Sequence, residues 1–178
     1  MFTSRLTPRI VLTRVLPLAL LSVSALLVLA APFSRPATAR VAGPSCWASA
    51  DTHVISVSAG GTQTIAVRTN GLSPVGAGYR VLGSFSGTSP GSPFFSTFVP
   101  LNVDRYFVRL YSVGSPFVPG GNQGALDANG NALVQIVIPP GAPSWLIGTT
   151  VHHAIAPQQL LAQQPYCSSA AIPLTFVP

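Results

Sequence analysis

The 178-residue chain contains no lysine and no glutamate, so its charged residues are nine arginines and three aspartates. Lysine and glutamate usually cover the solvent-facing sides of helices, and their absence predicts few helices. Three carboxylates also leave little material for an acid–base pair or for the paired carboxylates of a glycosidase. The composition therefore argues against a helical protein and against carboxylate-based hydrolysis.

The N-terminal segment has the pattern of an export signal. Three arginines are followed by an uncharged apolar run over residues 15–31 and then by the small residues of Ala37-Thr38-Ala39. This order predicts a signal peptide over residues 1–39 and a mature chain of residues 40–178. An uncleaved anchor is the alternative, because a run of about 17 residues is near the shortest that spans a bilayer as a helix. We expect the remainder outside the cytoplasm, secreted or periplasmic, and away from the membrane once the signal is cut.

The mature part carries a small net charge. Its five arginines stand against three aspartates, which gives a formal charge of +2. A surface that binds nucleic acid normally has a denser basic cluster, because each phosphate contact needs a cation. We therefore expect no nucleic acid among the partners. The length of the mature part suits one domain with a single core.

Residues 40–178 are rich in Gly, Pro, Ser, Thr, Val and Phe, which is typical of short strands joined by sharp turns. Apolar and polar residues alternate in several segments, as they do when successive side chains point to opposite faces of a sheet. About eight or nine strands are predicted, which favours an all-β, antiparallel β-sandwich of the immunoglobulin or fibronectin type. A closed β-barrel is the alternative.

Two turns predict hairpins. Ala59-Gly60-Gly61 separates an apolar alternation at 55–57 from another at 65–67. Asn129-Gly130 supplies the positive φ angles of a tight turn, and a clear alternation over 134–138 follows it.

Six short motifs lie in the mature part: SVSAGGTQT at 56–64, VLGSFSGTSPG at 81–91, PLNVD at 100–104, LDANG at 126–130, HHA at 152–154 and PLTFVP at 173–178. Together they resemble a family of uncharacterised modules in exported bacterial proteins, often found near the carboxyl end of larger chains. The resemblance runs through the whole mature domain. It implies an all-β accessory module outside the cytoplasm, with no established activity.

The chain has two cysteines, Cys46 and Cys167, near the two ends of the mature part. Exported chains meet oxidising conditions and an even count leaves no thiol over, so we predict a disulfide between them. The alternatives are two buried thiols or metal ligands together with a histidine. Neither cysteine has the Cys-x-x-Cys spacing of a zinc site, and we predict no metal.

His152 and His153 are adjacent, so on a strand they point to opposite faces and cannot easily bind one metal together. If Val151 and Ile155 belong to the core, His153 shares their face and is predicted to be a hydrogen-bonded core histidine. His152 then lies outside with Thr150.

Two aspartates invite functional interpretations. Asp127 with Asn129 and Asn131 resembles the start of a calcium loop, but the glycine spacing and the closing glutamate of such a loop are missing, so a plain turn is predicted. Asp104 is interpreted as a turn and ion-pair residue rather than a catalytic acid.

The most suggestive surface comes from residues 105–111, read as part of a strand that runs to about Val113. Aromatic rings interleaved with arginines can stack on sugar rings and hydrogen-bond to hydroxyl or acidic groups. The alternative is that the rings pack under a neighbouring loop with arginine stems over them. The predicted ligand-binding face consists of Arg105, Phe107, Arg109 and Tyr111, opposite a face of Tyr106, Val108 and Leu110.

These observations predict a secreted, non-catalytic structural or interaction domain. One alternative is a carbohydrate-binding module that uses the face at 105–111, and a second is a small hydrolase that uses His152 or His153. The expected partner is a cell-envelope polysaccharide or a surface protein. No catalytic residue and no cofactor are predicted, and the oligomeric state is open.

Overall fold

The computed structural model describes residues 45–70, 77–159 and 164–178. The predicted export signal, residues 1–39, lies outside these ranges. All of the described residues fall within one compact unit of the chain. Among them, no helix is both long and apolar enough to span a bilayer.

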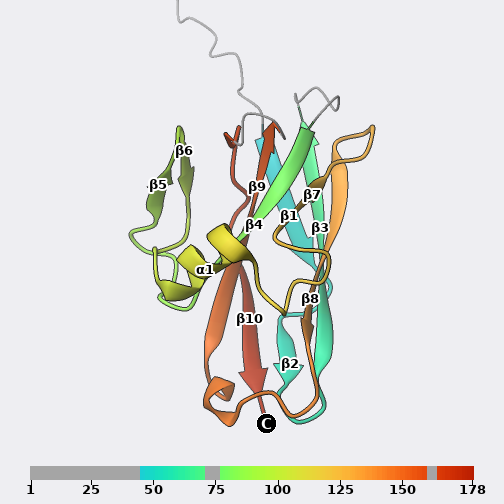
Figure 1. Cartoon of the computed structure of the whole chain (residues 1–178), viewed down its shortest axis with the longest axis vertical. Coiled ribbons are helices and arrows are strands. Elements are labelled where there is room, and N and C mark those ends of the chain that lie inside the picture. The colour runs from blue at the N-terminus through green and yellow to red at the C-terminus, as the bar shows by residue number, and fades with distance from the viewer. Residues whose placement is uncertain (1–44, 71–76, 160–163) are drawn as a thin grey trace, which may run out of the picture. The chain divides into compact units, whose positions relative to one another are not determined.

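Ten strands of the described part form two sheets and a separate hairpin (Figure 1). One sheet has the order β1-β3-β8 and the other β2-β10-β9-β4-β7, while β5 pairs with β6. Paired strands are antiparallel except β2 and β10, which are parallel. The all-β sandwich is thus confirmed, and the described strands do not close into a barrel. The strands are β1 Ser45–Ala50, β2 Val54–Ser56, β3 Gly61–Asn70, β4 Ala77–Ser84, β5 Ser92–Phe94, β6 Thr97–Val99, β7 Gln123–Ala125, β8 Asn131–Ile138, β9 Thr150–Gln159 and β10 Ile172–Val177.

The main core lies between the two sheets and uses the alternating apolar residues. Ile65 and Val67 of β3 and Ile136 of β8 are buried against Ile155 of β9 and Leu174 of β10. Burying each such side chain contributes about 1.5–3 kcal/mol, so this layer is a main source of stability.

A second apolar cluster covers the other face of β4 and β9. Leu82 and Ala154 point away from the main core and contact Phe107, Val99 and Leu101. Val99 comes from the β5–β6 hairpin, Leu101 from the segment after it and Phe107 from the helix that follows, and Figure 1 shows this part of the chain beside β4 and β9. Because both faces are covered, β4 and β9 are buried almost without interruption.

Residues Arg105–Val113 form helix α1, so the strand predicted there is wrong. Asp104 has extended backbone angles, and its Oδ1 accepts a hydrogen bond from the Phe107 N–H at 2.8 Å, which caps the first turn. Gly114 ends the helix with a φ of 83°. Phe107 and Leu110 are both buried, three residues apart as a helix face requires. A single-turn 3-10 helix, Ser144–Leu146, precedes β9.

The two turns form where they were predicted, but neither joins a hairpin. After the turn at Gly60, β3 pairs with β1 and β8, whereas β2 pairs with β10. After the turn at Gly130, which has a φ of 77°, β8 pairs with β3 while β7 pairs with β4. Each turn passes the chain from one sheet to the other. Gly60 is required there, because a Cβ at its φ of 72° would lie 2.7 Å from the Ile138 carbonyl oxygen.

The predicted disulfide between Cys46 and Cys167 is confirmed, with a Cα–Cα distance of 5.9 Å. Cys46 lies on β1 of the three-stranded sheet. Cys167 lies in the segment before β10 of the five-stranded sheet. The bond therefore ties the two layers together at one end of the domain, and a disulfide is typical of an oxidising compartment.

Candidate functional site

Helix α1 lies beside the part of β4 that β7 leaves unpaired. β7 pairs with β4 only at Gly78, Tyr79 and Arg80, so the next residues of β4 are free to contact the helix. A Cβ on Gly83 would collide with the ring of Tyr106. The glycine on β4 thus allows Tyr106 to lie close against the sheet.

Asp104 fixes the start of the helix with both of its carboxylate oxygens. Oδ1 caps the helix at the Phe107 N–H, and Oδ2 accepts from the Phe85 N–H at 2.7 Å and the Ser86 N–H at 2.9 Å. The hydroxyls of Ser84 and Ser86 also donate to Oδ2. Burial would raise the pKa of Asp104, but these hydrogen bonds outweigh it and hold the pKa below its ordinary value of 3.8. Asp104 was predicted to be a turn and ion-pair residue, but it caps a helix, and its partners among the described residues are N–H and hydroxyl groups rather than an arginine.

The end of the helix is held by Arg80 and Asn122. The Arg80 guanidinium donates to the Tyr111 carbonyl oxygen and to Gln123 Oε1, each at 3.0 Å. It also lies over the Tyr111 ring, 4.6 Å from the ring centroid. Asn122 donates to the carbonyl oxygens of Leu110 and Tyr111. Arg80 thus contacts both the backbone and the ring of Tyr111 within the domain.

The four residues of the predicted ligand-binding face do not share a face. Phe107 is only 4% exposed, and Phe94 of β5 packs edge-on against both Phe107 and Tyr111, at 5.8 and 5.3 Å between ring centroids. These two rings therefore lie under the β5–β6 hairpin, which is the alternative that the sequence left open. Arg105 and Arg109 are exposed, one helical turn apart, on a different side of α1.

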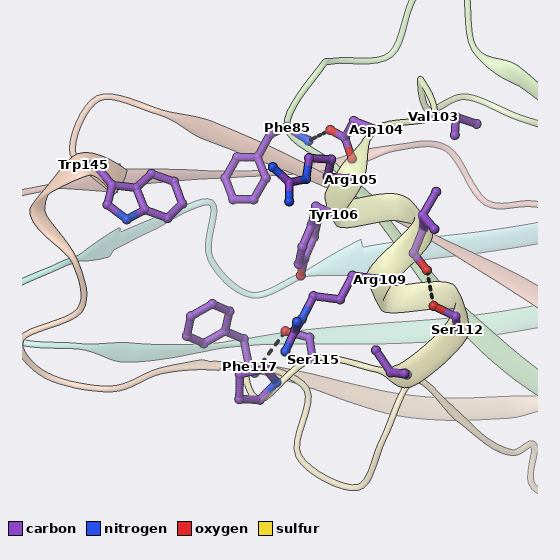
Figure 2. Close-up of a pocket in the computed structure, with 13 residues that line it drawn as sticks. Phe85, Val103, Asp104, Arg105, Tyr106, Arg109, Ser112, Ser115, Phe117 and Trp145 are labelled. Carbon is purple, nitrogen blue, oxygen red and sulfur yellow. Dashed lines mark hydrogen bonds between the residues drawn. The ribbon is translucent and has the colours of Figure 1, made fainter.

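An open groove of about 1080 Å³ lies on that side of the helix. Figure 2 shows the side chains of Arg105, Tyr106 and Arg109 pointing from α1 toward Phe117 and Trp145. Phe85, at the end of β4, lies between Tyr106 and Trp145. The groove is largely apolar and carries two guanidinium groups along the helix.

Three aromatic rings form a row along the groove. Phe85 meets Tyr106 edge-on at 5.1 Å between centroids and is tilted against Trp145 at 6.0 Å. Trp145 is 65% exposed, while its neighbour Leu146 is buried and anchors the 3-10 helix. The row thus runs from the buried interior to solvent on a fixed backbone.

The inner end of the row is the buried pair Tyr106 and His153. The Tyr106 hydroxyl and His153 Nε2 are 3.1 Å apart, which confirms His153 as a hydrogen-bonded core histidine. Burial raises the pKa of Tyr106 to about 12, so its hydroxyl keeps its proton at neutral pH. His152 lies on the opposite face of β9 and is half-buried. A ligand in the groove would meet Tyr106 before it could reach His153.

The burial of His153 predicts a stability loss in acid. Burial, with a smaller effect of His152, lowers the pKa of His153 from 6.5 to about 4. Between these values the unfolded chain binds a proton that the folded chain does not, so the free energy of unfolding should fall by about 3 kcal/mol as the pH drops from 6.5 to 4. Urea denaturation at several pH values measures this slope. His153→Gln should remove most of this pH dependence of stability, whereas His53→Gln, at an exposed histidine, should keep it. Equal slopes in the two variants would contradict the assignment of the pH dependence to His153.

The Asp127 segment is a turn, as predicted. Asp127 Oδ1 accepts from the N–H groups of Asn129 and Asn131, both at 2.8 Å. Within the ranges that the structure describes, no three His, Cys, Asp or Glu side chains gather as metal ligands would.

Sequence reasoning found the two arginines of the groove but not its rings. It placed Tyr106 on the face opposite Arg105, since a strand alternates, whereas on a helix these neighbours are both able to line one groove. The signal for the helix was Asp104 as a cap, with apolar residues at 107, 110 and 111. Phe85, Phe117 and Trp145 come from separate segments, and no spacing in the sequence links them.

Comparisons with known proteins leave the groove as the main guide to function. No protein-family model matches the chain, and no curated protein is similar enough in sequence to match it. The resemblance to uncharacterised modules of exported proteins therefore stays a prediction.

Proposed function

We propose that this chain is an exported, non-catalytic binding domain that holds a polysaccharide in the groove beside α1. The observation that carries the proposal is the row of Tyr106, Phe85 and Trp145 along an open groove, with two guanidinium groups beside it. Sugar rings present C–H faces that pack on aromatic rings, and their hydroxyls accept hydrogen bonds from guanidinium groups.

The exposure of Trp145 supports this use of the groove. An indole ring that is 65% exposed keeps apolar surface in contact with water, and covering it with a ligand is favourable. The backbone beneath it is fixed by buried Leu146 and by hydrogen bonds within the 3-10 helix, such as Leu146 N–H to the Pro143 carbonyl. Little conformational freedom would then be lost when a ligand stacks on this ring.

The ionisable groups at the groove support binding rather than catalysis. Both oxygens of Asp104 are occupied by internal donors, and burial raises the pKa of Tyr106 to about 12, still further above neutral pH than the ordinary value of 10. His153, the candidate base of a hydrolase, is fully buried behind Tyr106. A general base must lie within hydrogen-bond reach of the group that it deprotonates.

The disulfide supports a location outside the cytoplasm. Bonds of this kind persist in oxidising compartments, and the predicted signal peptide would deliver the chain there. We propose that the domain works in the periplasm or outside the cell, on a polysaccharide of the cell envelope.

A glycan array tests the proposed function. The purified exported protein, with its disulfide formed, is expected to be retained by at least one polysaccharide. Trp145→Ala should weaken that retention tenfold or more, because a stacked ring is lost. Trp47→Ala is the matched control, since Trp47 is also exposed, at 54%, but lies on β1.

Two results would contradict the proposal. One is a blank array from protein that shows a cooperative melting curve, which would favour a protein partner. The other is retention that Trp145→Ala and Trp47→Ala reduce equally, since the ligand would then lie elsewhere.

A further inference from the structure

We infer that the groove recognises an acidic polysaccharide, whose anionic groups bind Arg105 and Arg109 while its sugar rings pack on Tyr106 and Trp145. This inference rests on the proposed function, and it adds that the ligand is negatively charged and that Arg105 and Arg109 bind its charged groups.

The two guanidinium groups are placed to act together. Arg105 and Arg109 lie four residues apart on α1, which brings their Cβ atoms to about 5–6 Å from each other. Figure 2 shows both side chains on the groove side of the helix, with Tyr106 between them. Two anionic groups on one polymer, or two oxygens of one group, could therefore contact both arginines.

Neither guanidinium has a partner within the described part of the chain, where no hydrogen bond or ion pair involves Arg105 or Arg109. Arg80 shows the contrast: it is 6% exposed and binds the Tyr111 carbonyl oxygen and Gln123. A buried arginine of this domain thus serves the fold, whereas the pair on α1 is available to a ligand.

The aspartate side chains of the chain bind backbone N–H groups rather than Arg105 or Arg109. The chain has three, and each accepts backbone N–H groups in its own neighbourhood: Asp51 from Thr64, Asp127 from Asn129 and Asn131, and Asp104 from Phe85, Ser86 and Phe107. Asp104 also lines the groove, but both of its oxygens are turned to these donors. Asp104 is ionised at neutral pH, so its charge against those of Arg105 and Arg109 leaves the groove a formal charge of 2 − 1 = +1, which an anion from outside would neutralise.

The apolar wall strengthens such a contact. Guanidinium groups are weakly hydrated and bind carboxylate, phosphate and sulfate through two parallel hydrogen bonds. Next to Phe85, Tyr106 and Phe117 the effective dielectric constant is lower than in bulk water, which strengthens the attraction between opposite charges. A neutral glycan would offer the guanidinium groups only hydroxyl acceptors, whose hydrogen bonds are weaker than those of an anion, so an acidic glycan should bind more tightly.

The experiment compares an acidic polymer with a neutral polymer of the same sugar backbone. Polygalacturonate carries a carboxylate on each sugar, and its fully methyl-esterified form has the same backbone without the charge. We expect immobilised polygalacturonate to retain the exported protein at least tenfold more tightly than the ester. Dextran sulfate against dextran repeats the comparison with a sulfate and separates carboxylate recognition from a general preference for anions. Raising the salt concentration should weaken binding to the acidic polymers alone.

Substitutions at the arginines locate the effect. The double variant Arg105→Gln/Arg109→Gln should bind polygalacturonate no better than the ester, while its binding to the ester should fall by a much smaller factor, because only hydrogen bonds to hydroxyls are lost there. Arg68→Gln is the matched control, because Arg68 is an exposed arginine on β3. Arg105→Gln and Arg109→Gln singly should each weaken binding to the acidic polymer more than Arg68→Gln does.

The outcomes separate this inference from the proposed function. Equal binding to the acid and the ester, lost in Trp145→Ala, overturns the acidic ligand and keeps the polysaccharide site. Equal weakening by Arg68→Gln and by the α1 variants overturns the inference, because the attraction is then that of the whole surface. Retention by none of these polymers, together with a blank glycan array, overturns both.

Discussion

Replacing Cys46 and Cys167 together by alanine is expected to lower the free energy of unfolding by about 4–5 kcal/mol. The disulfide closes a loop of 121 residues, and the loop-closure entropy of an unfolded chain gives this magnitude. A typical domain is stable by only 5–15 kcal/mol, so the double variant should be close to unfolding at room temperature. Urea denaturation of the unmodified protein and the variant, at the same pH, measures the difference.

The position of the bond predicts where the structure loosens first. β1 is an edge strand, which pairs only with β3 among the described strands. Without the disulfide at Cys46, this pairing is its main attachment to the sheet. Amide hydrogen exchange in the reduced protein should therefore rise first in β1. A loss of less than 1 kcal/mol, or unchanged exchange in β1, would mean that the sheet pairing alone fixes this end of the domain.

Asp104→Asn is expected to cost about 2–4 kcal/mol of the free energy of unfolding. The carboxylate accepts hydrogen bonds on both oxygens, from the Phe107 N–H on one side and the Phe85 and Ser86 N–H groups on the other. An asparagine can accept on one side only, so its NH₂ group must face a backbone donor whichever way it turns. Either the helix cap or the end of β4 then loses its partner.

Asp127→Asn is the matched control for this prediction. Asp127 uses a single oxygen, Oδ1, for both of its backbone hydrogen bonds, and the carbonyl oxygen of an asparagine can take its place. The denaturation midpoint of Asp127→Asn should therefore stay close to that of the unmodified protein. Similar losses in the two variants would show that charge, rather than hydrogen-bond geometry, determines the role of Asp104.

Asp104 and His153 also contribute to stability over different ranges of pH. Because the pKa of Asp104 lies below its ordinary value, its contribution to stability is present above pH 3.8 and disappears as the pH falls through the folded-state pKa. His153 acts in a higher window, between pH 6.5 and about 4. A denaturation series from pH 7 to pH 3 should therefore show two successive losses, and His153→Gln should remove only the first.

The groove also depends on a contact that stabilises the fold. Gly83 leaves room for Tyr106 to lie against β4, and Tyr106 in turn supports the Phe85 ring. The same ring that contacts the buried His153 thus forms the wall of the groove. Loss of packing at Tyr106 would change both stability and the shape of the site.

Alternation in the sequence identified several of the strands and the side chains that enter the core, but it wrongly predicted a strand at residues 105–113. Ile65, Val67 and Ile155 are buried as the period of two predicts. The sequence also determined the turns at Gly60 and Gly130, since glycine adopts positive φ without strain. The disulfide followed from the count of cysteines and from the predicted compartment.

Only the tertiary structure decided which strands pair and where the groove forms. A period of two predicts which face of a strand a side chain occupies, but not which strand pairs with it. The turns at Gly60 and Gly130, which connect the two sheets, therefore resemble hairpin turns in the sequence. The segment at 105–113 fits both a strand and a helix, and the carboxylate of Asp104 together with the open edge of β4 selected the helix. The ring row joins Phe85, Tyr106 and Trp145, which lie far apart in the chain and meet only because the sandwich brings their backbones together.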